Sequence, residues 1–119
     1  MTFRDIIEGM HAKDPAVRGG ALAGSDGLAV EEWSADPGGQ DLSALCAEMV
    51  QFFKESGRIA RENGLGESLE VIMAGDRGQV FLRKVTGDYF LLVVTDPGAI
   101  AGKCRFLLRQ GASRAREML

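Results

Sequence analysis

The feature that most constrains the fold is a fully apolar strand that leads straight into a helix. Residues 90–95 read F-L-L-V-V-T, without a charged side chain. Because successive side chains of a strand point to opposite faces, this strand must be covered on both faces. Asp96 is suited to cap a helix and Pro97 to occupy its first position, which predicts a final helix from Pro97 towards Met118. Covering both faces in so short a chain requires three layers, with helices on each side of a sheet.

Hydrophobic periodicity and turn residues divide the rest of the chain into two helices and four strands. In chain order, we predict a helix over residues 3–12, strands over 17–24 and 28–33, a helix over 41–63, and strands over 67–74 and 79–85. Asp41 is the expected cap of the long helix, and Gly64 and Gly66 are expected to end it. The fold class is therefore α/β, of the α+β type, and residues 1–119 form a single domain.

Composition excludes several classes of protein. The net charge is −3 and no basic stretch occurs, which argues against nucleic acid as a partner. No run approaches the ~18 apolar residues of a membrane span. Asp5 and Glu8 interrupt any signal-peptide core, so we expect a cytoplasmic protein.

Chemistry-bearing residues are sparse. With one histidine, His11, and no Cys-x-x-Cys, we expect no metal site. Cys46 and Cys104 lie far apart, and they read either as small buried hydrophobes or as a disulfide or redox pair. No phosphate-binding loop, dinucleotide fingerprint or nucleophile elbow is present. We therefore predict that the chain is not an enzyme and uses no cofactor.

Four glycines fall outside the predicted turns. They are Gly19, Gly20, Gly57 and Gly102. A glycine inside a strand or helix often marks a place where another part of the chain comes close. We expect these positions to mark close approach of backbones rather than a ligand site.

The long helix is apolar over more of its circumference than one sheet can cover. On a helical wheel its apolar side spans roughly 180°, whereas packing on a sheet needs ~100° or somewhat more. Either the helix sinks into a groove of its own domain, or one edge packs on the sheet and the other meets a second protein. The strand over 67–74 also carries apolar residues on both sides, and as an edge strand it would offer unpaired backbone groups to another chain.

Three ordered motifs from Val17 to the C-terminus make the chain similar to the Roadblock family, which includes dynein light chain roadblock, bacterial MglB-type proteins and Ragulator subunits. The first motif is V-R-G-G-A-L-A-G-S-D-G-L-A-V, an opening hairpin with a D-G turn. The second is the long helix closed by N-G-L-G-E. The third, a three-strand meander with the following helix, is V-I-M-A-G-D-R-G-Q-V-F-L-R-K-V-T-G-D-Y-F-L-L-V-V-T-D-P-G-A-I-A-G-K.

The resemblance implies a three-layer sandwich around a five-stranded antiparallel sheet in the order 2-1-5-4-3. The long helix would lie on one face and the two terminal helices on the other. It also implies a homodimer built on the long helix and the third strand. The expected interface residues are Cys46, Met49, Val50, Phe53, Gly57, Leu69, Val71 and Ile72.

Family members bind small Ras-like GTPases, motors or scaffolds, and the family has no shared catalytic residue. In a two-fold dimer the polar sides of the long helices would form one face for a GTPase. The residues expected there are Glu48, Gln51, Lys54, Glu55, Arg58 and Glu62. The leading hypothesis is a non-catalytic homodimeric regulator or scaffold for such a GTPase, including a GTPase-activating partner. A structural adaptor without a GTPase partner is the alternative, and a small-ligand sensor is a third reading, disfavoured because no convergent polar group is evident.

Overall fold

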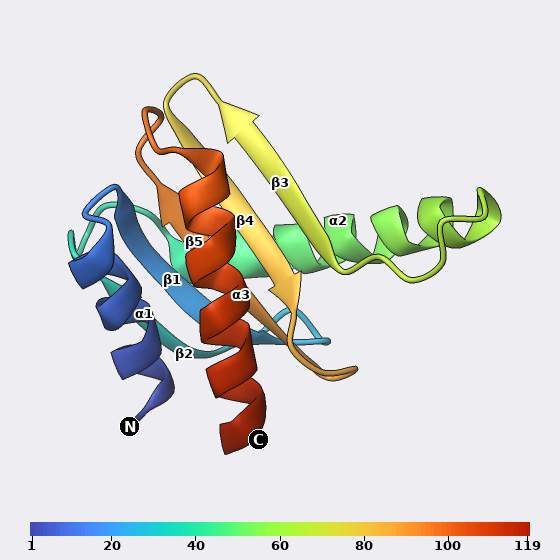
Figure 1. Cartoon of the computed structure of the whole chain (residues 1–119), viewed down its shortest axis with the longest axis horizontal. Coiled ribbons are helices and arrows are strands. Elements are labelled where there is room, and N and C mark those ends of the chain that lie inside the picture. Colours follow the sequence, from blue (N-terminus) through green and yellow to red (C-terminus); the bar gives the residue numbers. More distant parts are fainter.

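The computed structural model describes residues 1–119 and consists of one five-stranded sheet and three helices. The elements in chain order are α1 (Phe3–Lys13), β1 (Val17–Gly24), β2 (Ala29–Ser34), α2 (Leu42–Glu62), β3 (Glu70–Gly75), β4 (Gly78–Lys84), β5 (Tyr89–Thr95) and α3 (Ala101–Met118). All neighbouring strands are antiparallel, in the order β2-β1-β5-β4-β3 (Figure 1). The predicted fold class and strand order are confirmed.

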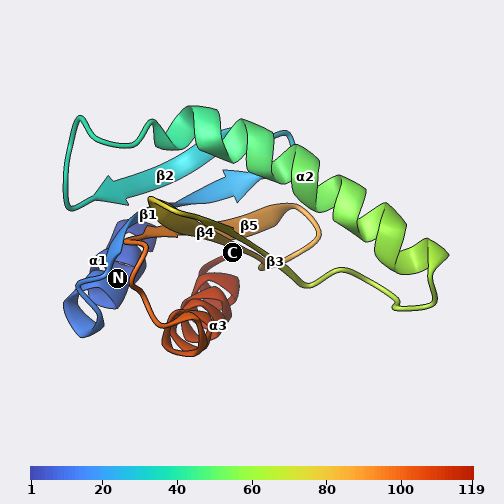
Figure 2. The ribbon, with the colours of Figure 1, turned by 90° about the horizontal axis from the view of Figure 1, so that it is seen from above.

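The three layers are visible when the molecule is viewed from above. Helix α2 crosses one face of the sheet, and α1 and α3 cover the other (Figure 2). The C-terminal part of α2 projects beyond the sheet on the side where the chain returns to β3 (Figures 1 and 2). A stretch of this helix therefore has no sheet beneath it.

The central strand β5 is covered on both faces, as its sequence predicts. Leu91 and Val93 belong to the core cluster beneath α1 and α3. Phe90 and Leu92 belong to the second cluster, beneath α2. All four are buried, so the alternation of side chains along one strand supplies both cores.

Local signals set the two ends of α2. The side chain of Asp41 accepts a hydrogen bond from the Ala44 N–H at 3.0 Å, which confirms the predicted N-cap. At the other end Gly64 takes φ +74°, and the Leu65 N–H returns to the Ala60 carbonyl at 2.8 Å. This left-handed residue closes the helix, as expected of a glycine in that position.

The predicted start of the final helix was wrong. Helix α3 begins at Ala101, and its N-cap residue Ile100 offers no side-chain bond. Asp96 instead opens a tight turn in which the Ala99 N–H donates to the Asp96 carbonyl at 3.2 Å, with Pro97 in the second position. Proline fits that position of a β-turn as well as it fits the first turn of a helix, so the local signal was ambiguous.

Two of the four unassigned glycines mark close backbone approach. A Cβ on Gly20 would collide with the Leu92 carbonyl oxygen and would lie 3.2 Å from the Ile7 side chain, while one on Gly19 would lie 2.8 Å from the Trp33 carbonyl oxygen. Gly20 thus lets α1 settle onto the sheet, and Gly19 lets β2 lie close to β1. The expectation fails at Gly57, whose Cβ position meets only the Arg61 side chain, and at Gly102, which has nothing within 4 Å of its Cβ position.

Candidate protein-interaction site

The inner face of α2 is used within the chain itself. Cys46, Met49, Val50, Phe53 and Gly57 are all buried in this helix. The first four belong to the core cluster formed with β1, β4 and β5. Five of the eight expected interface residues are therefore buried within the chain itself. The sequence defined the apolar arc but not which part of it the sheet would cover.

One flank of α2 remains apolar and exposed. Phe52 and Ile59 are each 47 % exposed and lie seven residues apart, which places them on the same side of the helix. Ser56 lies between them on that side, and its hydroxyl is 3.0 Å from the hydroxyl of Ser68, just before β3. The flank with Phe52 and Ile59 is therefore the one nearest β3.

Strand β3 is an edge strand with exposed apolar side chains. It pairs only with β4, so its outer backbone groups are free. Leu69 and Met73 are 57 % and 47 % exposed, and Val71 is half-buried. Val71 and Met73 are paired with Leu82 and Val80, whose side chains lie on the α2 side of the sheet.

Together these residues form a candidate contact surface on two neighbouring elements. We call Phe52, Ile59, Leu69, Val71 and Met73 the α2–β3 apolar surface. Ile72, also expected at the interface, is 39 % exposed but pairs with Phe81, so it lies on the opposite side of the same strand. Phe52, Ile59 and Met73 were absent from the expected interface. The helical wheel for Phe52 and Ile59, and the alternation along the strand for Met73, could have identified them.

An ion triad fixes the start of β3. The Glu70 carboxylate is 3.3 Å from Arg83 Nη1 on β4 and 2.7 Å from Arg105 Nε on α3. Its side chain is only 7 % exposed, so these contacts form in a partly desolvated place. The edge strand is thereby joined to its neighbour and to a helix on the far face.

The six residues expected to meet a partner are all exposed on the outer side of α2. Arg58 binds both Glu55 and Glu62, with 2.7 Å between Arg58 Nη1 and Glu62 Oε2. The hydrogen bond to Arg58 holds the pKa of Glu55 below its usual range, and the same bond raises the pKa of Arg58. Lys54 makes no ion pair, and Glu48 and Gln51 likewise have no side-chain partner. On the polar face, three of the six residues are therefore paired with one another and the other three are free to meet a partner.

The cysteines and acidic residues offer little chemistry. Cys46 and Cys104 are free, buried and located in the clusters on opposite faces of the sheet, so they cannot form a disulfide with each other. Burial raises the pKa of the Cys46 thiol to about 11, and burial together with the Asp14 carboxylate raises that of Cys104. No group of three or more His, Cys, Asp or Glu side chains is arranged to hold a metal ion. None of the helices combines the length and the apolar character required to cross a bilayer.

Comparison with known proteins identifies the fold. No protein-family profile matches the chain, and no curated protein sequence does. Among solved structures, an MglB with tetrameric arrangement is 17 % identical over 98 % of this chain and 86 % of that chain, with a TM-score of 0.89. The gliding protein MglB from Thermus thermophilus is 16 % identical over 98 % and 87 %, with a TM-score of 0.88. A Roadblock/LC7 domain from Streptomyces avermitilis is 16 % identical over 97 % and 95 %, with a TM-score of 0.86. The chain therefore has the Roadblock fold.

Proposed function

We propose that this chain is a non-catalytic regulator or scaffold that forms a homodimer through the α2–β3 apolar surface and binds a small Ras-like GTPase on the polar face of α2. The observation that carries the proposal is the coincidence of exposed apolar side chains with an unpaired strand edge. They occur on α2 and β3, the two elements through which the Roadblock resemblance implies dimerisation.

Dimerisation would cover both the unpaired edge of β3 and the exposed apolar side chains of α2. An unpaired strand edge invites pairing with another strand, and a second copy of β3 would satisfy its free backbone groups. The same approach would bury Phe52 and Ile59 of one chain against the matching helix of the other. In a two-fold interface each patch meets its own copy, so it must be self-complementary, as an apolar patch is.

Light scattering coupled to gel filtration tests the dimer. We expect twice the chain mass of 12.8 kDa at micromolar concentration. Phe52→Glu should give a folded monomer, because two carboxylates would face a desolvated interface. The matched control is Phe106→Glu on α3, which is 63 % exposed on the other face of the sheet and should leave the dimer intact. A monomeric wild type, or equal behaviour of the two variants, contradicts the proposed interface.

Charge reversal tests the GTPase-binding face. Charges at the rim of an interface mainly tune association rate and specificity. The double variant Glu48→Lys/Glu55→Lys should therefore weaken binding of a Ras-like GTPase from the source organism, loaded with GDP or a non-hydrolysable GTP analogue, while the dimer persists. The control Glu8→Lys/Glu117→Lys makes the same change in net charge on α1 and α3.

The outcome also separates the two leading hypotheses. If the double variant binds as well as wild type at low and moderate salt, the GTPase contacts another face. If no Ras-like GTPase binds the wild-type dimer, the adaptor alternative replaces the regulator. A GTPase partner of this kind would place the chain in the cytoplasm.

A non-catalytic role has its own consequence. The purified chain should neither hydrolyse GTP or ATP nor bind them tightly, because it carries no phosphate-binding loop. Calorimetry and a phosphate-release assay measure both properties. Micromolar nucleotide binding, or turnover that survives repeated purification, contradicts the non-catalytic assignment.

A further inference from the structure

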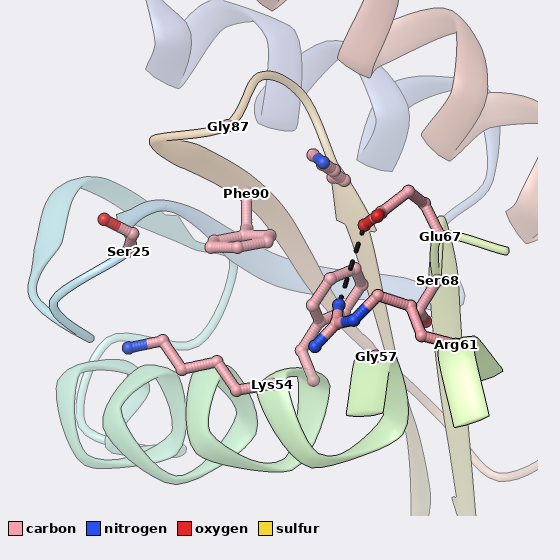
Figure 3. A pocket seen from close by; sticks show the side chains of 10 residues that line it. Ser25, Lys54, Gly57, Arg61, Glu67, Ser68, Gly87 and Phe90 are labelled. Atoms are coloured by element: carbon pink, nitrogen blue, oxygen red, sulfur yellow. Dashed lines mark ion pairs between the residues drawn. The ribbon is translucent and has the colours of Figure 1, made fainter. Parts of the chain in front are cut away.

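A polar cavity lies between the second half of α2, the β1–β2 turn, the β4–β5 turn and the segment that leads from α2 into β3. Its volume is about 250 Å³. Phe53 and Phe90, which are only 6 % and 5 % exposed, form its apolar floor, with ring centroids 4.8 Å apart. Figure 3 shows Phe90 between Ser25 on one side and Arg61 on the other. The lining thus combines residues that are far apart in sequence, so no single sequence motif identifies the cavity.

The charges around this cavity are unbalanced. Lys54, Arg61 and Lys84 line it, and Glu67 is the only carboxylate among the lining residues. Arg61 Nη1 is 3.7 Å from Glu67 Oε2, whereas Lys54 and Lys84 form no ion pair. Three cations and one anion leave a net charge of +2 in a chain whose own net charge is −3. Three like charges around one cavity repel each other, and a bound anion relieves that repulsion.

Gly57 is part of the same construction. It lies in the interior of α2, where glycine is less favourable than alanine. A Cβ there would stand 3.2 Å from Arg61 Nη1 and would meet no other atom within 4 Å. The missing side chain leaves room for the guanidinium to lie back along the helix at the cavity. Gly57 thus lowers the helix propensity of α2 at the position where the missing side chain keeps the cavity open.

We infer that this cavity binds a small organic phosphate monoester, with the phosphate among Lys54, Arg61 and Lys84 and the carbon portion against Phe53 and Phe90. A monoester carries close to two negative charges above its second pKa of about 6, which matches the net charge of the site. Its three terminal oxygens suit ammonium and guanidinium donors, and the Ser25 hydroxyl is also at hand, whereas the Ser68 hydroxyl already pairs with that of Ser56. A single carboxylate would leave part of this donor set unused.

The inference goes beyond the proposed function and shares with it only Lys54, which also belongs to the expected GTPase-binding face. The cavity lies on the Lys54 and Arg61 side of α2, whereas Phe52 and Ile59 form the other flank. Light scattering reports on the dimer whether or not the cavity is occupied.

Titration of the isotope-labelled chain of 119 residues with phenyl phosphate, followed by NMR in a phosphate-free buffer, tests the site. We expect saturable shifts at Ser25, Lys54 and Ser68, weaker ones with inorganic phosphate, and none with phenol or with added sodium chloride at equal ionic strength. Binding should weaken as the pH falls through about 6, where the ester gains a proton. Absence of saturable shifts with phenyl phosphate, or equal shifts with phenol, overturns the inference.

Variants distinguish a specific phosphate site from non-specific electrostatic attraction of anions. Lys54→Gln and Lys84→Gln should each weaken binding about tenfold, since each removes one charge-assisted bond. Arg109→Gln on α3 makes the same change in net charge away from the cavity and should leave affinity unchanged. Gly57→Ala should reduce binding while it raises the midpoint of thermal unfolding, so loss of binding cannot be assigned to misfolding. Equal affinities in the Lys54, Lys84 and Arg109 variants, or full binding by Gly57→Ala, overturn the site.

Discussion

At the scale of single residues, the burial of Cys46 makes the stability of the protein depend on pH. Cys46 lies in α2, and its thiol is fully buried between this helix and the sheet. Desolvation, with a contribution from Glu32, raises the pKa of the thiol from 9.0 to about 11. Between these two values the unfolded chain releases the proton and the folded chain keeps it. The contribution of this thiol to stability is therefore complete below pH 9 and is lost as the pH rises towards 11.

We expect the free energy of unfolding of the wild type to fall by about 2–3 kcal/mol more than that of Cys46→Ala over this interval. Denaturant unfolding at a series of pH values measures the difference between the two proteins. Cys104, whose pKa is also raised, is present in both and cancels in the comparison. Parallel pH profiles for the two proteins contradict the assignment.

At the scale of elements, the contact between β1 and α1 depends on glycine. Gly20→Ala would push a methyl group into the Leu92 carbonyl and the Ile7 side chain, and we expect a loss of about 1–3 kcal/mol of stability from this overpacking. The matched change is Gly9→Ala in α1, where nothing lies within 4 Å, and it should stabilise the protein by about 0.5–1 kcal/mol. Chemical denaturation of both variants measures the contrast, and effects of the same sign would refute this account.

The attachment of the edge strand rests on Glu70. Removing this carboxylate leaves Arg83 and Arg105 without their partner, in side chains that are 23 % and 43 % exposed. Because both arginines can still reach water, we expect Glu70→Ala to cost about 2 kcal/mol rather than the ~3–5 kcal/mol of a fully buried pair. Amide exchange should accelerate in β3 first.

The comparison for Glu70 is Glu31→Ala. This change breaks only the exposed 3.8 Å contact with Arg4 and should stay within about 0.5 kcal/mol of wild type. If the two variants lose equal stability, the triad is no more than a surface pair.

At the scale of the whole molecule, the proposed dimer makes stability depend on concentration. A ligand that binds only the folded state stabilises it by mass action, and here the ligand is a second copy of the chain. The midpoint of thermal unfolding should rise by about 2–4 °C for each tenfold increase in protein concentration. Scanning calorimetry or fluorimetry across a dilution series measures this slope. Phe52→Glu should abolish it and Phe106→Glu should keep it; a flat series for the wild type would argue against a dimer.

Features that are encoded within a few neighbouring residues could be predicted from the sequence. Alternation along residues 90–95 placed β5 between two cores, and Asp41 and Gly64 set the ends of α2 through bonds to groups within a few positions. Where one local signal served two structures, as with Pro97, the prediction failed, and α3 begins at Ala101. Strand order followed from the Roadblock resemblance rather than from such local rules.

The division of the wide apolar arc of α2 into a buried and an exposed part depends on how the helix packs in the folded chain. The helix crosses the sheet so that Phe53 is buried and Phe52 is left exposed, although both lie on the apolar half of the wheel. The phosphate cavity likewise required α2, the β1–β2 turn and the ends of β3 and β4 to converge. Local propensity and periodicity act over a turn or two of chain, whereas the position of a helix on a sheet is fixed by packing between residues far apart in sequence.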